Sequence, residues 1–358
     1  MATQREARWD NIKFFLIFLV VLGHFAENFT DYYAGCRALF VYIYTFHMPA
    51  FLFISGLFSK KVIDAKRFSW TKTIPYLVLA AFLSFYRNLS LYLLNPEHGF
   101  HYKNQSNISW YLFVLFFMYL ITYLVKKFPE KTVLITSVLL ALMAGFDSNI
   151  GKEWALSRII VFFPFFYAGY ILDRDEVEEF LDNKVWKAAS LFIMLGYAAF
   201  IFFFIDYFYG VRTFFTGQNS YYAIFGEFTA YAPGIRAVCY LATTVTMFAF
   251  MALIPKGRIP VISKAGQYTL GVYFWHLPLA TLLNNLVPLM AIVTVSLRNT
   301  TIYILAASLV YTLVLSIPVF SWPLDWILRP GKRHTLTREE RKARREERKA
   351  LKEGSKFE

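Results

Sequence analysis

The sequence is poor in cysteine and in charge. Among its 358 residues, only Cys36 and Cys239 are cysteines, and charged residues make up 17%. These two form neither a CxxC pair nor a Cys/His cluster at zinc spacing, so the pattern supports no metal or redox centre. Whether Cys36 and Cys239 pair with each other is left open by the sequence.

A cleavable signal peptide is also lacking. The first apolar stretch, residues 11–29, is longer than a signal core of about 7 to 15 residues and has no small-residue cleavage site. Apolar residues instead make up 57% of the chain and recur along its length, whereas soluble domains average about 45–50%. We therefore predict an all-α polytopic membrane protein.

Ten apolar stretches approach the length of about 20 residues that crosses a bilayer as a helix. Lys and Arg gather in alternate connections, so the positive-inside rule places both termini in the cytoplasm. The acidic connection 172–184 opposes this only weakly, because acidic residues count little in the rule. The net charge of +13 then reflects topology rather than nucleic-acid binding. The predicted helices cover residues 11–29, 37–58, 74–94, 108–125, 131–146, 157–172, 186–205, 233–254, 267–287 and 302–320.

Two parts follow from this pattern, a transmembrane domain over residues 1–328 and a basic cytoplasmic tail over 329–358. Thr337 and Glu340 have the spacing of a capping box, and Glu/Arg pairs follow at helical separations, so we expect the tail to be a solvated, charged helix. Such a tail serves more often as an anchor on anionic lipids than as a partner site. The sequence does not indicate an oligomeric state.

Three histidines interrupt the apolar stretches. At about 1.5 Å per helical residue, His24 lies about 20 Å above the cytoplasmic edge, His47 about 15 Å below the outer edge and His276 about 13 Å above the cytoplasmic edge. A single intramembrane histidine usually links two helices, but three at similar depth indicate one buried polar site. Glu27 follows His24 by one turn and can orient its ring, or can be a plain interfacial carboxylate.

Arg87 is the deepest arginine, about 20 Å along its predicted helix, so it needs an anionic or carbonyl partner. Arg158 and Arg236 lie at the outer starts of their helices, where a guanidinium can reach lipid headgroups. Lys13, at the inner end of the first helix, has the same interpretation as a boundary anchor.

Several of these stretches resemble the acyltransferase-3 family of integral-membrane acyltransferases, and among its branches the one described as fucose 4-O-acetylase-like. The similarity runs in order from residue 8 to about 278. It is carried by RWDNIKFFLIFLVVLGHF, YTFHMPAFLFISGLF, SWYLFVLFFMYL, RIIVFFPFFYAGY and QYTLGVYFWHLP. A basic residue separated from a histidine by ten others, here Lys13 and His24, is a signature of the family.

The resemblance implies an acyl donor in the cytoplasm, usually acetyl-CoA, and a carbohydrate acceptor that is lipid-linked or lies outside. The location it implies is a bacterial cytoplasmic membrane, and the product would be an O-acetylated cell-envelope polysaccharide. His24 is then the expected general base, because a hydroxyl needs one to attack a thioester. His47, His276 and Glu27 complete the expected catalytic set.

Donor binding is expected to involve Lys13, Arg67, Lys72, Arg87 and Ser55. The family tends to have more arginine where this chain has Arg67 and Lys72. Ser55 and Gly56 either allow close helix packing or contact the thioester.

The connection 206–231 is rich in Tyr and Phe, which fits either a platform for the acceptor sugar or an aromatic belt at the membrane interface. The competing function is a secondary transporter or a flippase for a glycan precursor, in which the intramembrane His and Arg would form a proton or substrate site.

Overall fold

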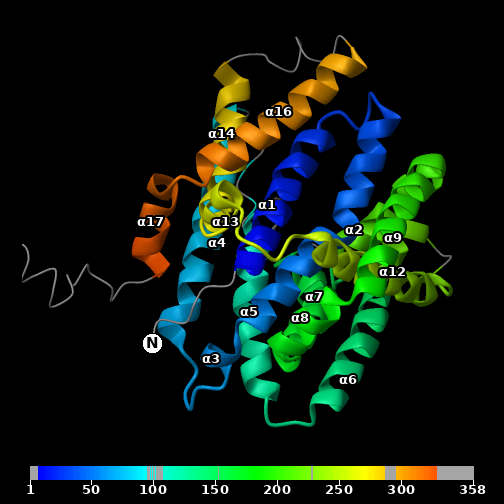
Figure 1. Cartoon of the computed structure of the whole chain (residues 1–358), viewed down its shortest axis with the longest axis vertical. Helices are drawn as coiled ribbons and strands as arrows, with labels where there is room; N and C mark the ends of the chain where they lie inside the picture. The colour runs from blue at the N-terminus through cyan, green and yellow to red at the C-terminus, as the bar shows by residue number, and fades with distance from the viewer. Residues whose placement is uncertain are drawn as a thin grey trace, which may run out of the picture.

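The computed structural model describes residues 7–94, 97, 99, 101, 108–151, 153–226, 229–286 and 296–328, and in these the regular structure is entirely helical (Figure 1). The predicted all-α class is confirmed. The predicted tail, 329–358, lies outside the described residues. Each of the ten predicted ranges is occupied mainly by one helix, namely α1 (Ala7–Glu27), α2 (Ala34–Leu57), α4 (Trp70–Leu94), α5 (Ser109–Val125), α6 (Glu130–Met143), α7 (Leu156–Ile171), α9 (Lys184–Phe203), α12 (Ala232–Leu253), α14 (Thr269–Leu286) and α16 (Leu297–Leu315).

Six of the described helices are both long and apolar enough to cross a membrane alone, namely α1, α2, α4, α9, α12 and α16. Helix α7 reaches that length only together with α8 (Arg174–Asp182), to which it is joined at a bend of 96°. On the lipid-facing helices large apolar side chains point outward, as at Phe192 and Phe203, which are 75% and 78% exposed. The chain is therefore an integral membrane protein, while ten spans and cytoplasmic termini stay predictions.

Short helices occupy several predicted connections. The acidic connection contains α8, whose first turn is capped by the Asp173 carboxylate accepting from the Asp175 backbone N–H. The aromatic connection 206–231 contains two helices and so is more ordered than a loop. The short helices are η2 (Ala144–Phe146), α3 (Lys60–Ile63), α8, α10 (Ile205–Thr216), α11 (Tyr221–Phe225), α13 (Pro260–Ala265) and α17 (Pro318–Leu328).

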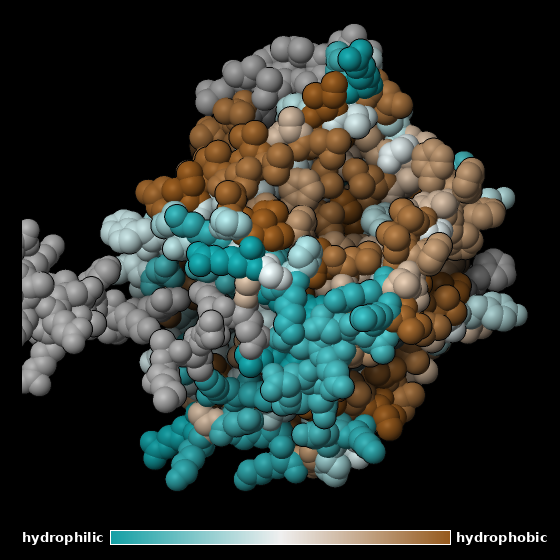
Figure 2. All heavy atoms as spheres, in the orientation of Figure 1, coloured by the Kyte–Doolittle hydropathy of each residue, from teal (hydrophilic) through white to brown (hydrophobic). Residues whose placement is uncertain are grey.

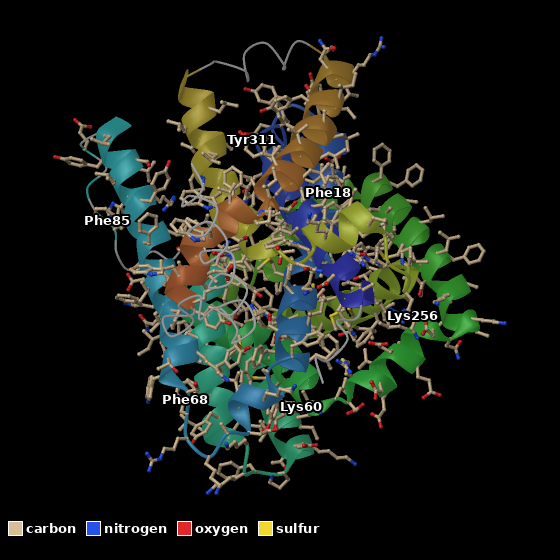
Figure 3. The ribbon with its side chains drawn as sticks, turned by 60° about the vertical axis from the view of Figure 1, so that its left-hand side comes forward. Phe18, Lys60, Phe68, Phe85, Lys256 and Tyr311 are labelled. Atoms are coloured by element: carbon tan, nitrogen blue, oxygen red, sulfur yellow. The ribbon has the colours of Figure 1, made fainter. Side chains whose placement is uncertain are left out.

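The connections rich in lysine and arginine lie on one side of the molecule, which we call the basic side. It comprises residues 58–72, 126–131 and 255–264. Lys126, at the end of α5, donates to the backbone carbonyls of Ile63 and Ala65 in the α3–α4 connection. Figure 2 shows hydrophilic side chains gathered over the lower part of the molecule, with hydrophobic ones above. Lys60 and Phe68 lie at that lower end in Figure 3, far from Tyr311 on α16.

Helix α2 lies at the centre and packs against α1, α7, α9, α10 and α12. Its crossing with α7 is a direct backbone contact, because a Cβ at Gly56 would lie 2.0 Å from the Phe166 carbonyl oxygen, and one at Gly169 would lie 2.0 Å from that of Phe53. Small residues permit this approach in membrane helices. Of the Ser55–Gly56 pair, Gly56 is therefore the residue that allows the close packing of α2 against α7.

Pro49 lies inside α2 and leaves the Thr45 carbonyl without its usual backbone partner. The Thr243 hydroxyl of α12 donates to that carbonyl at 2.8 Å. A membrane helix tolerates proline where a neighbouring Ser or Thr satisfies the freed group. This bond also fixes α12 against α2 two residues before His47.

Polar side chains near the start of α1 bind residues of the basic side. Asn11 donates to the carbonyls of Pro255 and Gly257, both at 2.9 Å, and accepts from the Ser263 hydroxyl. Arg8, which is 1% exposed, forms an ion pair with Asp182 of α8 at 3.0 Å. Asp182 also binds the ammonium groups of Lys187 and Lys256.

We expect Gly56→Ala to lower the free energy of unfolding by about 3 kcal/mol. The new methyl group would collide with the Phe166 carbonyl, which is part of the α7 backbone and cannot move aside as a side chain could. The matched control is Gly196→Ala on α9, where a Cβ meets no atom within 4 Å. Thermal unfolding in detergent should separate the two variants. An equal melting temperature for both would contradict the close α2–α7 contact.

Asp182 should make stability depend on pH. The hydrogen bond from Lys187 lowers the pKa of the Asp182 carboxyl to about 2, with help from Lys256 and Arg8 and against the effect of burial. A carboxyl with a lowered pKa stabilises the fold above its ordinary value of 3.8, and that contribution is lost as the pH falls toward 2. Asp182→Asn should thus cost roughly 2 kcal/mol at pH 7. Its deficit relative to the unmodified chain should shrink between pH 4 and pH 2 in thermal unfolding, and a pH-independent deficit would contradict this assignment.

Candidate active site

A cavity of about 620 Å³ opens on the side opposite to the basic side. Its walls come from α1, α2, α4, α5, α7, α10 and α14. Five residues of the predicted connection 206–231 that follow Arg212 line it as well, namely Thr213, Phe215, Thr216, Gln218 and Asn219. The polar side chains that line it include His24, Glu27, Tyr44, His47, Arg87 and Arg158.

The three intramembrane histidines meet at this cavity. The rings of His24 and His276 have centroids 5.4 Å apart, and the Tyr44 ring lies between His24 and His47, with centroid distances of 6.2 and 4.9 Å. His24 and His47 line the cavity, whereas His276 is fully buried behind His24. Three helices distant in sequence thus contribute imidazoles to one place.

His24 is held by a carboxylate and a phenol. Its Nδ1 lies 3.3 Å from Glu27 Oε2 and 3.4 Å from the Tyr44 hydroxyl. A carboxylate can only accept, so this contact favours the proton on Nδ1 and leaves the Nε2 lone pair available. The His24 side chain is 20% exposed, and Glu27, at 52%, lies nearer the mouth.

His47 and His276 have their tautomers set by the backbone. His47 Nδ1 lies 2.7 Å from the Ile43 carbonyl, and His276 Nδ1 lies within 3.0 Å of the Val272 and Tyr273 carbonyls. Because a carbonyl accepts, Nδ1 must carry the proton in both rings. When neutral, each ring can therefore only accept at Nε2.

Two arginines of the cavity were missed by sequence reasoning. Arg158 is not at lipid headgroups but is 7% exposed, donates from Nε to the Thr216 carbonyl at 3.1 Å and lies over the Trp110 ring at 4.2 Å. Arg212 reaches the cavity from α10. Arg236, also expected at headgroups, is buried and donates to the Ala141 carbonyl at 2.9 Å. No sequence signal distinguished these from boundary arginines, because all lie near helix ends.

Arg87 lies in the cavity wall and, within the described ranges, has no hydrogen-bond or ion-pair partner. It also lines a second cavity of about 230 Å³ between α4, α5 and α14, together with Ile108 and Leu277. These three residues belong to both cavities. The partner that depth predicted for Arg87 is thus not supplied by the described protein atoms.

The residues expected to bind the donor do not share one location. Lys13 pairs with Asp10 at 2.7 Å near the start of α1, and Arg67 and Lys72 are exposed on the basic side. Ser55 shares a hydrogen bond of 3.0 Å with the Tyr111 hydroxyl inside the helical bundle. Of the five, only Arg87 lines the large cavity. Cys36 and Cys239 are free thiols.

Comparison with known proteins gives one match. A family model of acyltransferase-3 type, described as an acyltransferase domain, matches residues 6–321. That range includes every histidine and arginine of the cavity. No curated protein and no solved structure matches the chain.

The accessibility of the three rings can be tested with diethyl pyrocarbonate, which acylates unprotonated imidazole. We expect His24 to react before His47 and His276, because those two are 3% and 0% exposed. Peptide mass spectrometry of the folded protein in detergent should show this order, with the exposed His101 as an internal reference. Modification of His276 as early as His24 would contradict the described arrangement.

Proposed function

Because the chain belongs to the acyltransferase-3 family, whose model matches nearly its whole length, we propose that it moves an acyl group from acyl-CoA to a carbohydrate hydroxyl in the cavity. The acyl group is most simply acetyl. The observation that carries the proposal is the His24 imidazole, which is oriented by Glu27 and presents its free Nε2 within a polar cavity.

His24 acts as the general base in this proposal. Nε2 takes the proton of the acceptor hydroxyl as its oxygen attacks the thioester carbonyl. The new C–O bond forms, the C–S bond breaks, and the proton passes from Nε2 to the departing CoA thiolate. Glu27 stabilises the imidazolium that exists between the two proton transfers, and the Tyr44 hydroxyl supports Glu27.

His47 and His276 have narrower roles in the same proposal. A neutral His47 has no donor proton at Nε2, so it serves as a proton acceptor beside His24 rather than as a donor to the thioester carbonyl. His276 packs against His24 and limits where that ring can lie. His24 is preferred to His47 as the base because, among the described residues, a carboxylate partner is found for His24 and not for His47.

The donor approaches from the basic side. Arg67 and Lys72 offer exposed cations to the phosphates of CoA, and Lys13 lies near the start of α1 on the same side. Between this side and the cavity, Ser55 is hydrogen-bonded to Tyr111, whose ring lies 5.4 Å from that of Tyr273 in the cavity wall. We propose that the acyl arm follows this line of hydroxyl groups toward His24.

The acceptor approaches from the opposite side. Phe215, Gln218 and Asn219 line the cavity there and offer one apolar ring and two amides, a combination suited to a sugar. The resemblance of the sequence stretches to the fucose 4-O-acetylase-like branch supports a carbohydrate of the cell envelope, reached from the outer face of a bacterial cytoplasmic membrane. Transport of a glycan precursor is the competing function, since it too would use a cavity lined by His and Arg.

His24→Ala should lower kcat for acyl transfer by about 10² to 10⁴, because it removes the base. Glu27→Gln should have a smaller effect, since the ring stays in place but its charged form loses support. His101→Ala, at an exposed histidine outside the cavity, is the control. The measurement is transfer of label from radioactive acetyl-CoA to glycan in membranes, at equal protein levels.

Undiminished labelling with His24→Ala would remove this residue from the mechanism. If the chain were a transporter, the same variant would change uptake or flipping, and no ester would appear on any glycan.

A further inference from the structure

The cavity carries an excess of positive charge. Arg87 of α4, Arg158 of α7 and Arg212 of α10 all line it, whereas Glu27 is the only carboxylate among the lining residues that the structure describes. Three separate helices supply the guanidinium groups, so their convergence is a product of the fold.

None of the three arginines has an ion-pair partner among the described residues. Glu27 contacts His24 and Tyr44. Arg158 is held by the Thr216 carbonyl and the Trp110 ring, and Arg212 by the carbonyl and the ring of Tyr209. These contacts orient each guanidinium and bring no carboxylate within ion-pair distance of it, although Arg212 lies near enough to Glu27 for a weaker electrostatic interaction.

Such an arrangement is costly unless an anion completes it. Like charges in a cavity walled by protein repel each other more strongly than in water, and an arginine withdrawn from water is normally paired. The planar guanidinium suits carboxylate and phosphate groups, which it binds with two parallel hydrogen bonds. The cavity therefore has the chemistry of an anion site beside the His24 ring.

We infer that the acceptor is an acidic carbohydrate, whose carboxylate or phosphate binds Arg87, Arg158 and Arg212 while a nearby hydroxyl faces His24 Nε2. This inference rests on the proposed function, because it identifies the substrate class of the same site. The inference adds that the enzyme selects its acceptor by the negative charge of the carbohydrate as well as by the sugar ring.

The phosphates of the donor do not explain these arginines. In CoA the phosphates lie at the far end of the pantetheine arm from the thioester, so a thioester at His24 keeps them away from the cavity. Exposed cations suited to them, such as Arg67, occur on the basic side. The cavity arginines lie instead on the opposite side, in the same cavity wall as Gln218 and Asn219.

Two sources of the anion share this chemistry, a sugar carboxylate and the phosphate of a lipid-linked carbohydrate. Arg87 borders the second cavity between α4, α5 and α14, which makes a lipid phosphate a real alternative to a uronic acid. The probes below distinguish the two.

Binding can be measured without any transfer activity. The full chain in lipid nanodiscs is titrated by calorimetry with glucuronate, with its neutral methyl ester and with inorganic pyrophosphate. We expect at least one anion to bind at least tenfold more tightly than the ester, with glucuronate indicating a carboxylate and pyrophosphate a lipid phosphate. Equal binding of anion and ester, or binding of neither anion, would overturn the inference.

Arg212→Gln should weaken binding of the preferred anion at least tenfold, and Arg87→Gln provides a second variant if the first is poorly folded. Arg258→Gln is the matched control, because Arg258 is an exposed arginine on the basic side. Equal losses in Arg212→Gln and Arg258→Gln would show a nonspecific charge effect and overturn the assignment.

Steady-state transfer separates this inference from the proposed function. Arg212→Gln should raise the KM for the acceptor glycan at least tenfold and leave the KM for acetyl-CoA unchanged; the reverse would assign the arginines to the donor and overturn the inference. If no acyl transfer occurs but anions still bind selectively, the proposed function fails and with it the assignment of the anion as an acceptor, while the anion site itself stands. If the unmodified chain and Arg212→Gln acylate neutral glycans at the same rate, the proposed function stands and only the inference fails.

Discussion

The backbone contact between α2 and α7 is the constraint on which the site depends. Gly56 and Gly169 allow the two helices to touch without intervening side chains, so small shifts of either helix are blocked. Helix α2 carries Tyr44 and His47. Helix α7 carries Gly169 near its C-terminal end and Arg158 near its N-terminal end. The position of His47 relative to Arg158 thus follows from a crossing that lies nearer the basic side than the cavity.

Burial of polar groups explains the rest of the arrangement. In an apolar environment each backbone donor and acceptor needs a partner, and neighbouring side chains can supply one, as the Thr243 hydroxyl does for the carbonyl freed by Pro49. In His47 and His276, Nδ1 donates to a backbone carbonyl, so only Nε2 can accept a proton. The structure therefore restricts the proton chemistry that each ring can perform.

The ten helical ranges could be predicted because a run of apolar residues of membrane length leaves few alternatives. The convergence of His24, His47 and His276 followed from depth alone, since a helix converts residue number into height. Depth could not show direction around the helix axis. The expected donor-binding set therefore joined Arg87 to Arg67 and Lys72, although Arg87 lines the cavity and the other two are exposed on the basic side.

By itself, the sequence determined that the chain is helical, lies in a membrane and buries three imidazoles at one depth, because hydropathy and helical rise act along the chain. Only the tertiary structure decided which side chains share the cavity. Arg158 and Arg212 lie near helix ends, where lipid headgroups explain an arginine equally well, and only the packing of α7 and α10 turns them inward. The charge of the cavity is a sum over helices that are distant in sequence, so it exists only once those helices pack together.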